Sequence, residues 1–121
     1  MNFTHSKIEI YIPETHLEKL IQAINKGGAG VIGEYDNCVS ITNVYGYWRP
    51  LKGADPYEGK VGKICKGSEV KVEVRCTKDK IQSTINEIIK VHPYEEPVVN
   101  IIPLVNHLYI DDYMHKEKEN K

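Results

Sequence analysis

Hydrophobic and polar residues alternate in two stretches of the chain, and this alternation is typical of half-buried β-strands. Isoleucine occupies every second position in residues 8–12, and valine does so in residues 70–74. Each stretch is followed by a segment in which hydrophobic residues recur every three or four positions, which is the spacing of an amphipathic helix. The pattern therefore predicts a strand and then a helix, and it predicts this pair twice.

Residue types at the ends of these segments set the predicted boundaries. Pro13 lacks a backbone N–H, so it ends the first strand and suits the first turn of the helix that follows. Gly27 and Gly28 supply the C-cap of that helix, and Gly30 continues the turn. The second helix ends before Pro93, because the residue before a proline is disfavoured in the helical conformation. The two helices are thus expected to end differently, the first on glycines and the second on a proline.

The two strand–helix pairs repeat one pattern. A shift of 64 residues places residues 7–10 (Lys-Ile-Glu-Ile) on residues 71–74 (Lys-Val-Glu-Val). The same shift superimposes hydrophobic helix positions, namely Leu17 on Ile81, Ile21 on Ile85 and Ile24 on Ile88. Further strands are predicted at residues 35–43 and 98–104. Two such β-α-β halves predict an α+β fold, a ferredoxin-like βαββαβ antiparallel sheet with both helices on one face.

A long segment, residues 44–67, separates the two halves. It holds five glycines, two prolines and the single tryptophan, and it is far longer than a hairpin turn. We expect an insertion that is either an extended β-hairpin or a structured loop. In a sheet of order 4-1-3-2, this insertion and the end of the second helix share one end of the sheet. The glycine turn at residues 27–30 should lie at the opposite end.

Composition narrows the class of protein. With 121 residues, 40% hydrophobic and 27% charged, the chain fits one soluble domain spanning residues 1–121. We expect its core at residues 6–104 and a polar tail at residues 112–121. A net charge of −1 gives no electrostatic footprint for nucleic acid or membrane, and residues 1–5 lack the basic-then-apolar pattern of a signal peptide. We therefore predict a cytoplasmic protein with neither a nucleic-acid nor a membrane partner.

The corner after the second helix holds the most unusual chemistry. His92, Glu95 and Glu96 together offer one nitrogen and up to two carboxylates to a divalent metal. The alternative is a rigid helix-to-strand corner, in which Pro93 and Pro97 fix the chain and the polar side chains make hydrogen bonds or subunit contacts. No second cluster supplies further ligands, so the structural interpretation is favoured, and no metal site or cofactor is predicted.

Two other segments bear on ligand binding. The glycine turn at residues 27–30 follows a helix, so no helix N-terminus presents N–H groups to a phosphate there, and we interpret it as structural. Residues 45–50 (YGYWRP) suit stacking on a flat ligand or packing across an interface, and the interface is favoured at this net charge. The candidate ligand or interface residues are therefore His92, Tyr94, Glu95, Glu96, Trp48 and Arg49.

Three runs occur together in the chain: residues 28–38 (GAGVIGEYDNC), 48–56 (WRPLKGADP) and 92–97 (HPYEEP). In this order and spacing they resemble the PII/CutA-like insert domain of the bacterial Nif-three-like dinuclear-metal proteins. The chain is similar to the stand-alone version, the YqfO-type family, over about residues 6–104. The last run and the strand after it also resemble the end of CutA, the trimeric divalent-cation-tolerance protein.

The resemblance implies a ferredoxin-like fold that assembles into trimers. In the full-length relatives the dinuclear metal site lies in the flanking domains, so its ligands are not carried over to this chain. The chain also lacks a recognisable PII nucleotide-binding motif, so ATP and 2-oxoglutarate sensing are not implied.

We therefore expect a PII/CutA-like binding or regulatory module that forms a homo-oligomer, with a trimer favoured, and takes a small ligand or a protein partner. The first alternative is a divalent-metal-binding homeostasis protein that uses His92, Glu95 or Glu96. The weaker alternative is a hydrolase with an unrecognised site. No serine or cysteine nucleophile stands in a recognisable frame with a base, so no catalytic residue is predicted.

Overall fold

The computed structural model describes residues 1–110 and has the element order β-α-β-β-α-β. The strands and helices are β1 (His5–Ile12), α1 (Leu17–Gly27), β2 (Val39–Trp48), β3 (Cys65–Thr77), α2 (Ile81–Val91) and β4 (Val98–Leu104). Single 3-10 turns precede both helices, η1 (Glu14–His16) and η2 (Lys78–Lys80), and a third, η3 (Asn106–Leu108), follows β4. The predicted polar tail lies outside the described residues.

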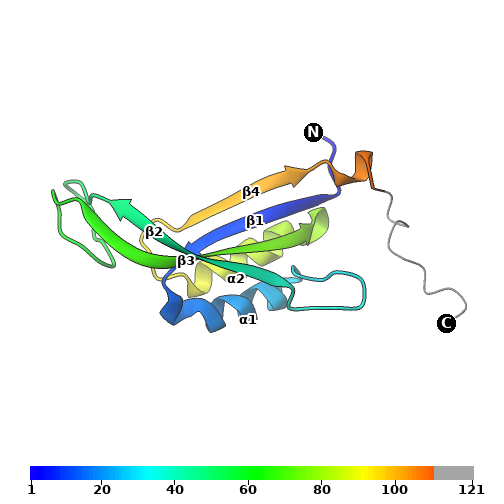
Figure 1. Cartoon of the computed structure of the whole chain (residues 1–121), viewed down its shortest axis with the longest axis horizontal. Helices are drawn as coiled ribbons and strands as arrows, with labels where there is room; N and C mark the ends of the chain where they lie inside the picture. The colour runs from blue at the N-terminus through cyan, green and yellow to red at the C-terminus, as the bar shows by residue number, and fades with distance from the viewer. Residues whose placement is uncertain (111–121) are drawn as a thin grey trace, which may run out of the picture.

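The four strands form one antiparallel sheet in the order β2-β3-β1-β4, with both helices on one face (Figure 1). The ferredoxin-like topology predicted from the repeat is thus confirmed. β1 and β3 occupy the centre, where the period-two pattern is strongest in the sequence. β2 and β4 are the edge strands, so each has one row of backbone groups without a strand partner in the chain.

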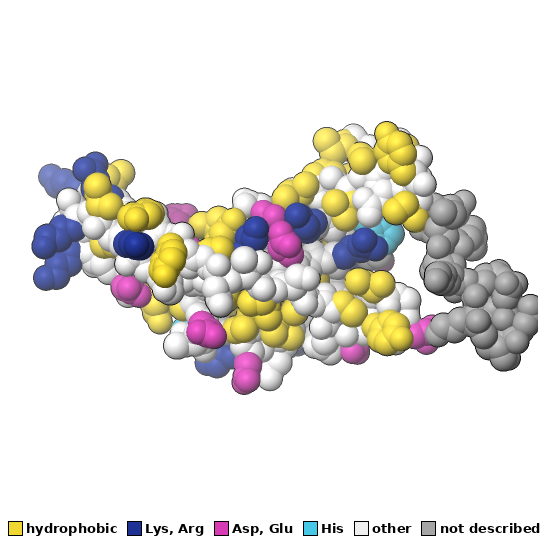
Figure 2. Space-filling view, viewed as in Figure 1, with side chains coloured by type: hydrophobic (Ala, Val, Ile, Leu, Met, Phe, Trp, Pro, Cys, Tyr) yellow, Lys and Arg dark blue, Asp and Glu magenta, His cyan; other side chains and the backbone are white. Residues whose placement is uncertain are grey.

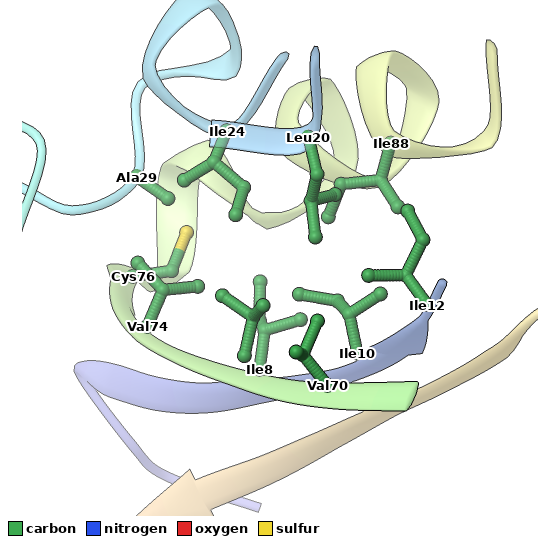
Figure 3. Close-up of a cluster of buried hydrophobic side chains, with 11 residues drawn as sticks. Ile8, Ile10, Ile12, Leu20, Ile24, Ala29, Val70, Val74, Cys76 and Ile88 are labelled. Carbon is green, nitrogen blue, oxygen red and sulfur yellow. The ribbon is translucent and has the colours of Figure 1, made fainter. Parts of the chain in front are cut away.

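The core lies between the central strands and the two helices. Ile8, Ile10 and Ile12 of β1 are fully buried, because alternate side chains of a strand point to one face. The helices bury their hydrophobic stripe against this face (Figure 3). The buried cluster comprises Ile8, Ile10, Ile12, Leu20, Ile24, Ala29, Val70, Val72, Val74, Cys76 and Ile88. This core fixes the elements from which the candidate site residues project.

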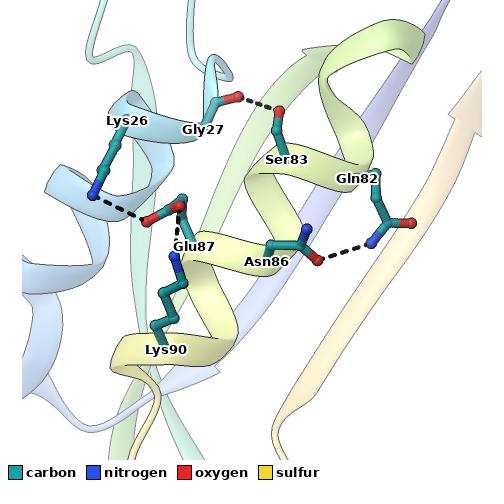
Figure 4. Close-up of polar contacts among 7 residues, drawn as sticks. All are labelled: Lys26, Gly27, Gln82, Ser83, Asn86, Glu87 and Lys90. Carbon is teal, nitrogen blue, oxygen red and sulfur yellow. Dashed lines mark hydrogen bonds and ion pairs between the residues drawn. The ribbon is translucent and has the colours of Figure 1, made fainter.

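The two helices approach each other most closely at Gly27. A methyl group on Gly27 would lie 2.4 Å from Cα of Thr84, which is closer than real atoms come. The Ser83 hydroxyl donates a hydrogen bond of 2.6 Å to the Gly27 carbonyl, and Glu87 pairs with a lysine from each helix beside it (Figure 4). Gly27 is therefore a packing residue, a role that its place in a predicted turn did not reveal.

The turn after α1 has the predicted glycine conformations. Gly28 ends the helix with φ of 104°, a left-handed conformation that a side chain disfavours. Gly30 follows with φ of 78°, and its N–H donates to the Arg75 carbonyl near the far end of β3. The turn thus lies at the opposite end of the sheet from the β2–β3 connection, as the topology predicts.

The segment between the halves is an extended β-hairpin. β2 starts four residues later than the sequence pattern predicts and continues to Trp48, which pairs with Cys65 of β3. The connecting loop is residues 49–64. The extended hairpin was one of the two predicted forms of the insertion, but its strand bounds were not predicted. Burial alternates in the outer strands, whereas hydrophobicity does not, because Tyr45 and Tyr47 lie on the exposed face and Gly46 lies on the half-buried one. Beyond the Ile12–Val70 pair, β2 and β3 bond only to each other, and this part forms an arm, residues 44–69.

No helix in residues 1–110 combines the length and the apolar character needed to span a bilayer.

Candidate functional site

The corner, residues 92–97, is anchored by the ring of His92. Its Nε2 lies 2.7 Å from the Tyr11 carbonyl, and its Nδ1 accepts the N–H of Tyr94 at 3.3 Å. Because a backbone N–H can only donate, Nδ1 is the unprotonated nitrogen and Nε2 carries the proton that Tyr11 accepts. Burial lowers the pKa of His92, so the ring is neutral at physiological pH. His92 therefore ties the end of α2 to the end of β1.

Tyr94 connects the corner to the arm. Its hydroxyl donates to Glu69 Oε2 of β3 at 2.7 Å, and both residues are half-buried. Burial and the Glu69 carboxylate raise the pKa of Tyr94 far above its usual value, so the phenol keeps its proton. This bond joins the start of β4 to the base of the arm.

The loop of the arm folds back onto the same corner. The side chain of Glu95 accepts the N–H of Asp55 at 2.9 Å. The ring of Tyr57 lies between those of His16 and Tyr94, with centroid distances of 6.1 and 5.9 Å. The corner and the insertion thus lie together, as predicted. Two contacts come from the loop, Asp55 to Glu95 and Tyr57 to Tyr94, and one comes from β3, Glu69 to Tyr94.

Trp48 and Arg49 occupy a different part of the arm. The Trp48 indole N–H donates to the Glu58 carbonyl at 3.0 Å, and the ring packs where a side chain on Gly67 would stand. Arg49 and Glu96 are exposed, and neither has a hydrogen bond or ion pair to another described residue. His92, Tyr94 and Glu95 thus share the corner, whereas Trp48 and Arg49 have no side-chain hydrogen bond, ion pair or ring contact with it among the described residues.

Two residues of this site, Glu69 and Tyr57, were not among the predicted ones. Glu69 stands directly before the alternating valines of β3, where the pattern gives it the face opposite to the valines. That signal shows which face Glu69 takes but not that Tyr94 reaches it. Tyr57 lies in a loop whose sequence shows no periodicity. The only signal for its position was the prediction that the insertion and the corner share one end of the sheet.

A cleft of about 540 Å³ opens at this end, between η1 and the base of the arm. Its lining residues are Pro13, Glu14, Thr15, Asn43, Val44, Tyr45, Ser68, Glu69 and Val70. Glu69 belongs both to the cleft and to the corner, through its bond to Tyr94. None of the six candidate residues from the sequence lines the cleft. Two carboxylates, three hydroxyl side chains and an amide lie among these residues, so the lining is acidic.

A second cleft, of about 380 Å³, lies at the far end of the sheet. It includes Lys7, Glu73 and Arg75 on β1 and β3, Leu104 at the end of β4, and Asn106 just after that strand. Lys7 pairs with Glu9 and Glu73, and these two carboxylates are the main cause of the raised pKa of Lys7. These charged groups already pair with one another, so fewer of them are free to bind a ligand than in the first cleft.

Metal-binding chemistry is weak in the described part of the chain. Both ring nitrogens of His92 are already bonded, which leaves no lone pair for a metal unless those bonds break. No group of three histidine, cysteine, aspartate or glutamate side chains within residues 1–110 is arranged to hold an ion. Cys38, Cys65 and Cys76 are free thiols, and burial raises the pKa of Cys76.

Comparison with known proteins places this geometry in context. The family model for the CutA1 divalent ion tolerance protein matches residues 57–116. A GTP cyclohydrolase 1 type 2 homolog of Bacillus subtilis is 38% identical over 98 residues, which cover 81% of this chain and 26% of the relative. The chain therefore spans about a quarter of the length of the curated relatives it matches.

Solved structures give the same answer for the fold. A Bacillus cereus protein related to NIF3 superimposes with a TM-score of 0.75 and 28% identity, over 86% of this chain and 26% of that one. A PII-like CutA from Nostoc superimposes with a TM-score of 0.66 and 19% identity, over 90% of this chain and 89% of that one. The second likeness extends over both whole chains and establishes a common fold.

Proposed function

We propose that this chain, which is a CutA/PII-like domain, works as a homo-oligomeric binding module without catalytic activity of its own. Its ligand occupies the cleft between η1 and the base of the arm. Binding there changes how firmly the corner at residues 92–97 holds the loop of the arm. The observation that carries this proposal is the double role of Glu69, which lines the cleft and accepts the hydroxyl of Tyr94.

The coupling follows from the bonds on either side of Glu69. A ligand that takes the Glu69 carboxylate weakens its bond to Tyr94, and Tyr94 packs against Tyr57 of the loop. Glu95, the next residue, holds the loop at Asp55. Binding in the cleft therefore changes how firmly the loop is held, which is the behaviour of a regulatory module. The two carboxylates of the cleft favour a small polar ligand with an amine.

Oligomerisation is supported by the edge strand β4. Val98, Ile101 and Ile102 keep 46, 45 and 38% of their surface exposed, although they alternate between both faces of the strand. An edge strand with exposed hydrophobic side chains and an unpaired backbone row is prone to association, and burial in a homo-oligomer covers it. We propose a trimer, the state implied by the resemblance to PII and CutA.

Catalysis by this chain has less support. The hydroxyls nearest to an imidazole are Thr4 beside His5 and Thr15 beside His16, and each pair is exposed and formed by adjacent residues. Such pairs lack the third group that orients a base. The divalent-metal alternative, which the CutA1 relationship favours in general terms, requires His92 to give up its bonds to Tyr11 and Tyr94.

The test combines two measurements on the full chain. Trp48 fluorescence is followed during titration with amino acids and polyamines, with nucleotides for comparison, in the wild type, Glu69→Gln and Glu69→Ala. We expect saturable binding of an amine that Glu69→Ala abolishes; a wild-type response retained in Glu69→Ala overturns the assignment of the cleft.

Sedimentation at micromolar concentration tests the assembly, and a monomer under these conditions would contradict the proposed oligomer. Calorimetry with Cu(II) and Zn(II) on the wild type and His92→Ala tests the metal alternative.

A further inference from the structure

The loop of the arm is joined to the rest of the chain through few groups. Within residues 1–110, hydrogen bonds and ring contacts connect this loop to residues outside the arm at two positions only. The N–H of Asp55 donates to the side chain of Glu95. The ring of Tyr57 packs against those of Tyr94 and His16. The other hydrogen bonds of the loop stay within the arm, so its position depends mainly on two consecutive residues of the corner.

The ring of His92 fixes these two residues, Tyr94 and Glu95. Its Nδ1 accepts the Tyr94 N–H at 3.3 Å, and its centroid lies 4.8 Å from that of the Tyr94 ring. On the other side, its Nε2 donates to the Tyr11 carbonyl at 2.7 Å. Pro93, which lies between His92 and Tyr94, has a fixed φ, so a change at His92 is passed on to Tyr94.

Only the neutral ring of His92 fits this arrangement. Nδ1 accepts through its lone pair, and an Nδ1 that takes up a proton becomes a donor that faces another donor, the Tyr94 N–H. That bond must then break. The bond from Nε2 to the Tyr11 carbonyl survives, because Nε2 donates in both protonation states. Protonation therefore leaves the end of α2 tied to β1 and acts on the segment that follows His92.

The charges of the corner and the loop act in the same direction. Residues 92–97 hold two carboxylates and a neutral histidine, a net charge of −2, whereas residues 49–64 hold four basic and two acidic residues, a net charge of +2. Figure 2 shows lysine and arginine side chains gathered at the end of the molecule where the arm projects. A proton on His92 halves the negative charge of the corner, so its attraction for the loop weakens.

We propose that the corner is a pH-sensitive switch, in which uptake of a proton by His92 releases the loop of the arm from Tyr94 and Glu95. The released loop stays connected to the domain through the paired strands β2 and β3. Every contact in this switch joins residues of one chain, so the switch does not depend on which surfaces the homo-oligomer buries. It is also independent of a ligand in the cleft, whose binding is assigned to Glu69.

The surroundings of His92 set the pH at which the switch responds. Burial lowers the pKa of His92, the Tyr11 carbonyl and the Glu69 carboxylate raise it, and His16 lowers it. A released ring regains the ordinary pKa of 6.5. The ratio of released to held loop therefore rises by up to about tenfold for each unit of pH below 6.5, until the pH reaches the lower pKa of the held ring. The titratable side chains around the switch are Glu69 on β3, His16 in η1, Tyr94 and Glu95 in the corner and Tyr57 in the loop.

NMR of the full chain, labelled with ¹⁵N, tests the switch between pH 7.5 and pH 5 without any ligand. The ring resonances of His92 and the amide resonance of Asp55, which donates to Glu95, should titrate together with one midpoint below 6.5. Over the same range, ¹⁵N relaxation should show the amides of the loop becoming more mobile on the nanosecond timescale. Far-UV circular dichroism should stay constant, because the strands and helices are retained.

Matched histidine variants identify the responsible ring. His92→Gln keeps a neutral polar side chain that takes up no proton, so the transition should disappear. His16→Gln removes the other histidine next to the loop, the one that contacts Tyr57, and should keep the transition with a slightly higher midpoint. Glu95→Ala removes the acceptor of Asp55 and should show a mobile loop at both pH values. The comparison of ring and amide midpoints in the wild type needs no variant, so it decides even if His92→Gln fails to fold.

Four results would overturn the proposal. The first is a loop whose mobility is the same at both pH values, or whose midpoint differs from that of the His92 ring. The second is a transition that persists in His92→Gln or disappears in His16→Gln, which would assign it to another group. The third is a rigid loop in Glu95→Ala at pH 7.5. The fourth is a loss of secondary structure or a smaller sedimentation coefficient at pH 5, which would make unfolding or dissociation the cause.

Discussion

The two helix-to-strand connections occupy equivalent places in the repeat, yet they are built differently. A shift of 64 residues places Gly28 on His92. The first connection turns through the left-handed conformation of Gly28 and packs against β3 and α2. The second keeps an extended conformation at His92 and is held by side-chain bonds to β1 and the arm. One connection is fixed by backbone geometry, whereas the other is fixed by polar groups that a ligand can compete for.

This difference teaches where a regulated contact can arise in a repeated fold. A glycine turn has no side chain to titrate or displace, so its stability responds only to substitution. The corner at residues 92–97 depends on hydrogen bonds of a histidine, a tyrosine and a glutamate, and each bond can be broken separately.

The largest effect should come from the first connection. Gly27→Ala places a methyl group 2.4 Å from Cα of Thr84, so the helices must separate. We expect a loss of about 3 kcal/mol in the free energy of unfolding, the upper range for overpacking. Gly33→Ala is the control, because Gly33 has φ of 58° but no neighbour within 4 Å. It should lose about 1 kcal/mol from backbone strain alone. Urea unfolding of both variants measures this, and equal losses would show that the helices can separate freely.

The second connection should be weakened most by His92→Ala. The substitution removes the bonds to Tyr11 and Tyr94 and leaves a small cavity, with an expected loss of about 2–3 kcal/mol. Gly28→Ala, at the equivalent place in the repeat, should lose only about 1 kcal/mol. Glu96→Ala is exposed and should stay within about 0.5 kcal/mol of the wild type. A loss for His92→Ala no greater than that for Glu96→Ala would contradict its anchoring role.

A single hydroxyl tests the bond between the corner and the arm. Tyr94→Phe leaves Glu69 without its partner and should lower the free energy of unfolding by about 1 kcal/mol. Tyr57→Phe is the matched control, since Tyr57 contributes its ring to the corner and its hydroxyl makes no hydrogen bond to the described residues. Chemical denaturation should separate the two variants; identical midpoints would remove Tyr94–Glu69 as a stabilising link.

The smallest effect is a pH dependence confined to the second connection. Burial lowers the pKa of folded His92 below its ordinary value of 6.5, so the unfolded chain binds this proton more readily. The stability contributed by neutral His92 is complete above about pH 6.5 and declines as the pH falls toward the folded pKa. Urea midpoints at pH 7 and pH 5.5 should show this decline in the wild type and a smaller one in His92→Gln. A wild-type midpoint that rises on acidification would reverse the sign of the pKa shift.

The sequence predicted the fold better than the site, and the reason is physical. Isoleucines at alternate positions of β1 and valines of β3 report burial on one face, so periodicity locates the central strands. β4 was placed at its observed bounds because Pro97 delimits its start. The outer part of the hairpin has one half-buried and one exposed face, but its tyrosines lie on the exposed face and glycines on the half-buried one, so no periodicity of hydrophobic residues marked it.

The site depends on contacts that periodicity does not encode. The topology correctly predicted that the corner meets the insertion, but it could not show that Tyr94 bonds to Glu69 or that Glu95 bonds to Asp55. Such contacts are set by side-chain rotamers across elements far apart in the sequence. His92 illustrates the same limit: the sequence favoured a structural corner over a metal ligand, but it could not show that the ring bonds to the Tyr11 carbonyl and the Tyr94 N–H.

The strand order also has a kinetic consequence. β1 is synthesised first but pairs with β3 and β4, so Tyr11 meets Lys71 and Val98 only after most of the chain exists. The β2–β3 hairpin, by contrast, closes through the loop at residues 49–64, which is much shorter than the stretch of chain that separates β1 from β3 or β4. Because long-range pairing requires large loops to close, the hairpin should form early and β1 should join last. Until then the hydrophobic face of β1 has no cover, and during synthesis it is the segment in greatest need of protection from aggregation.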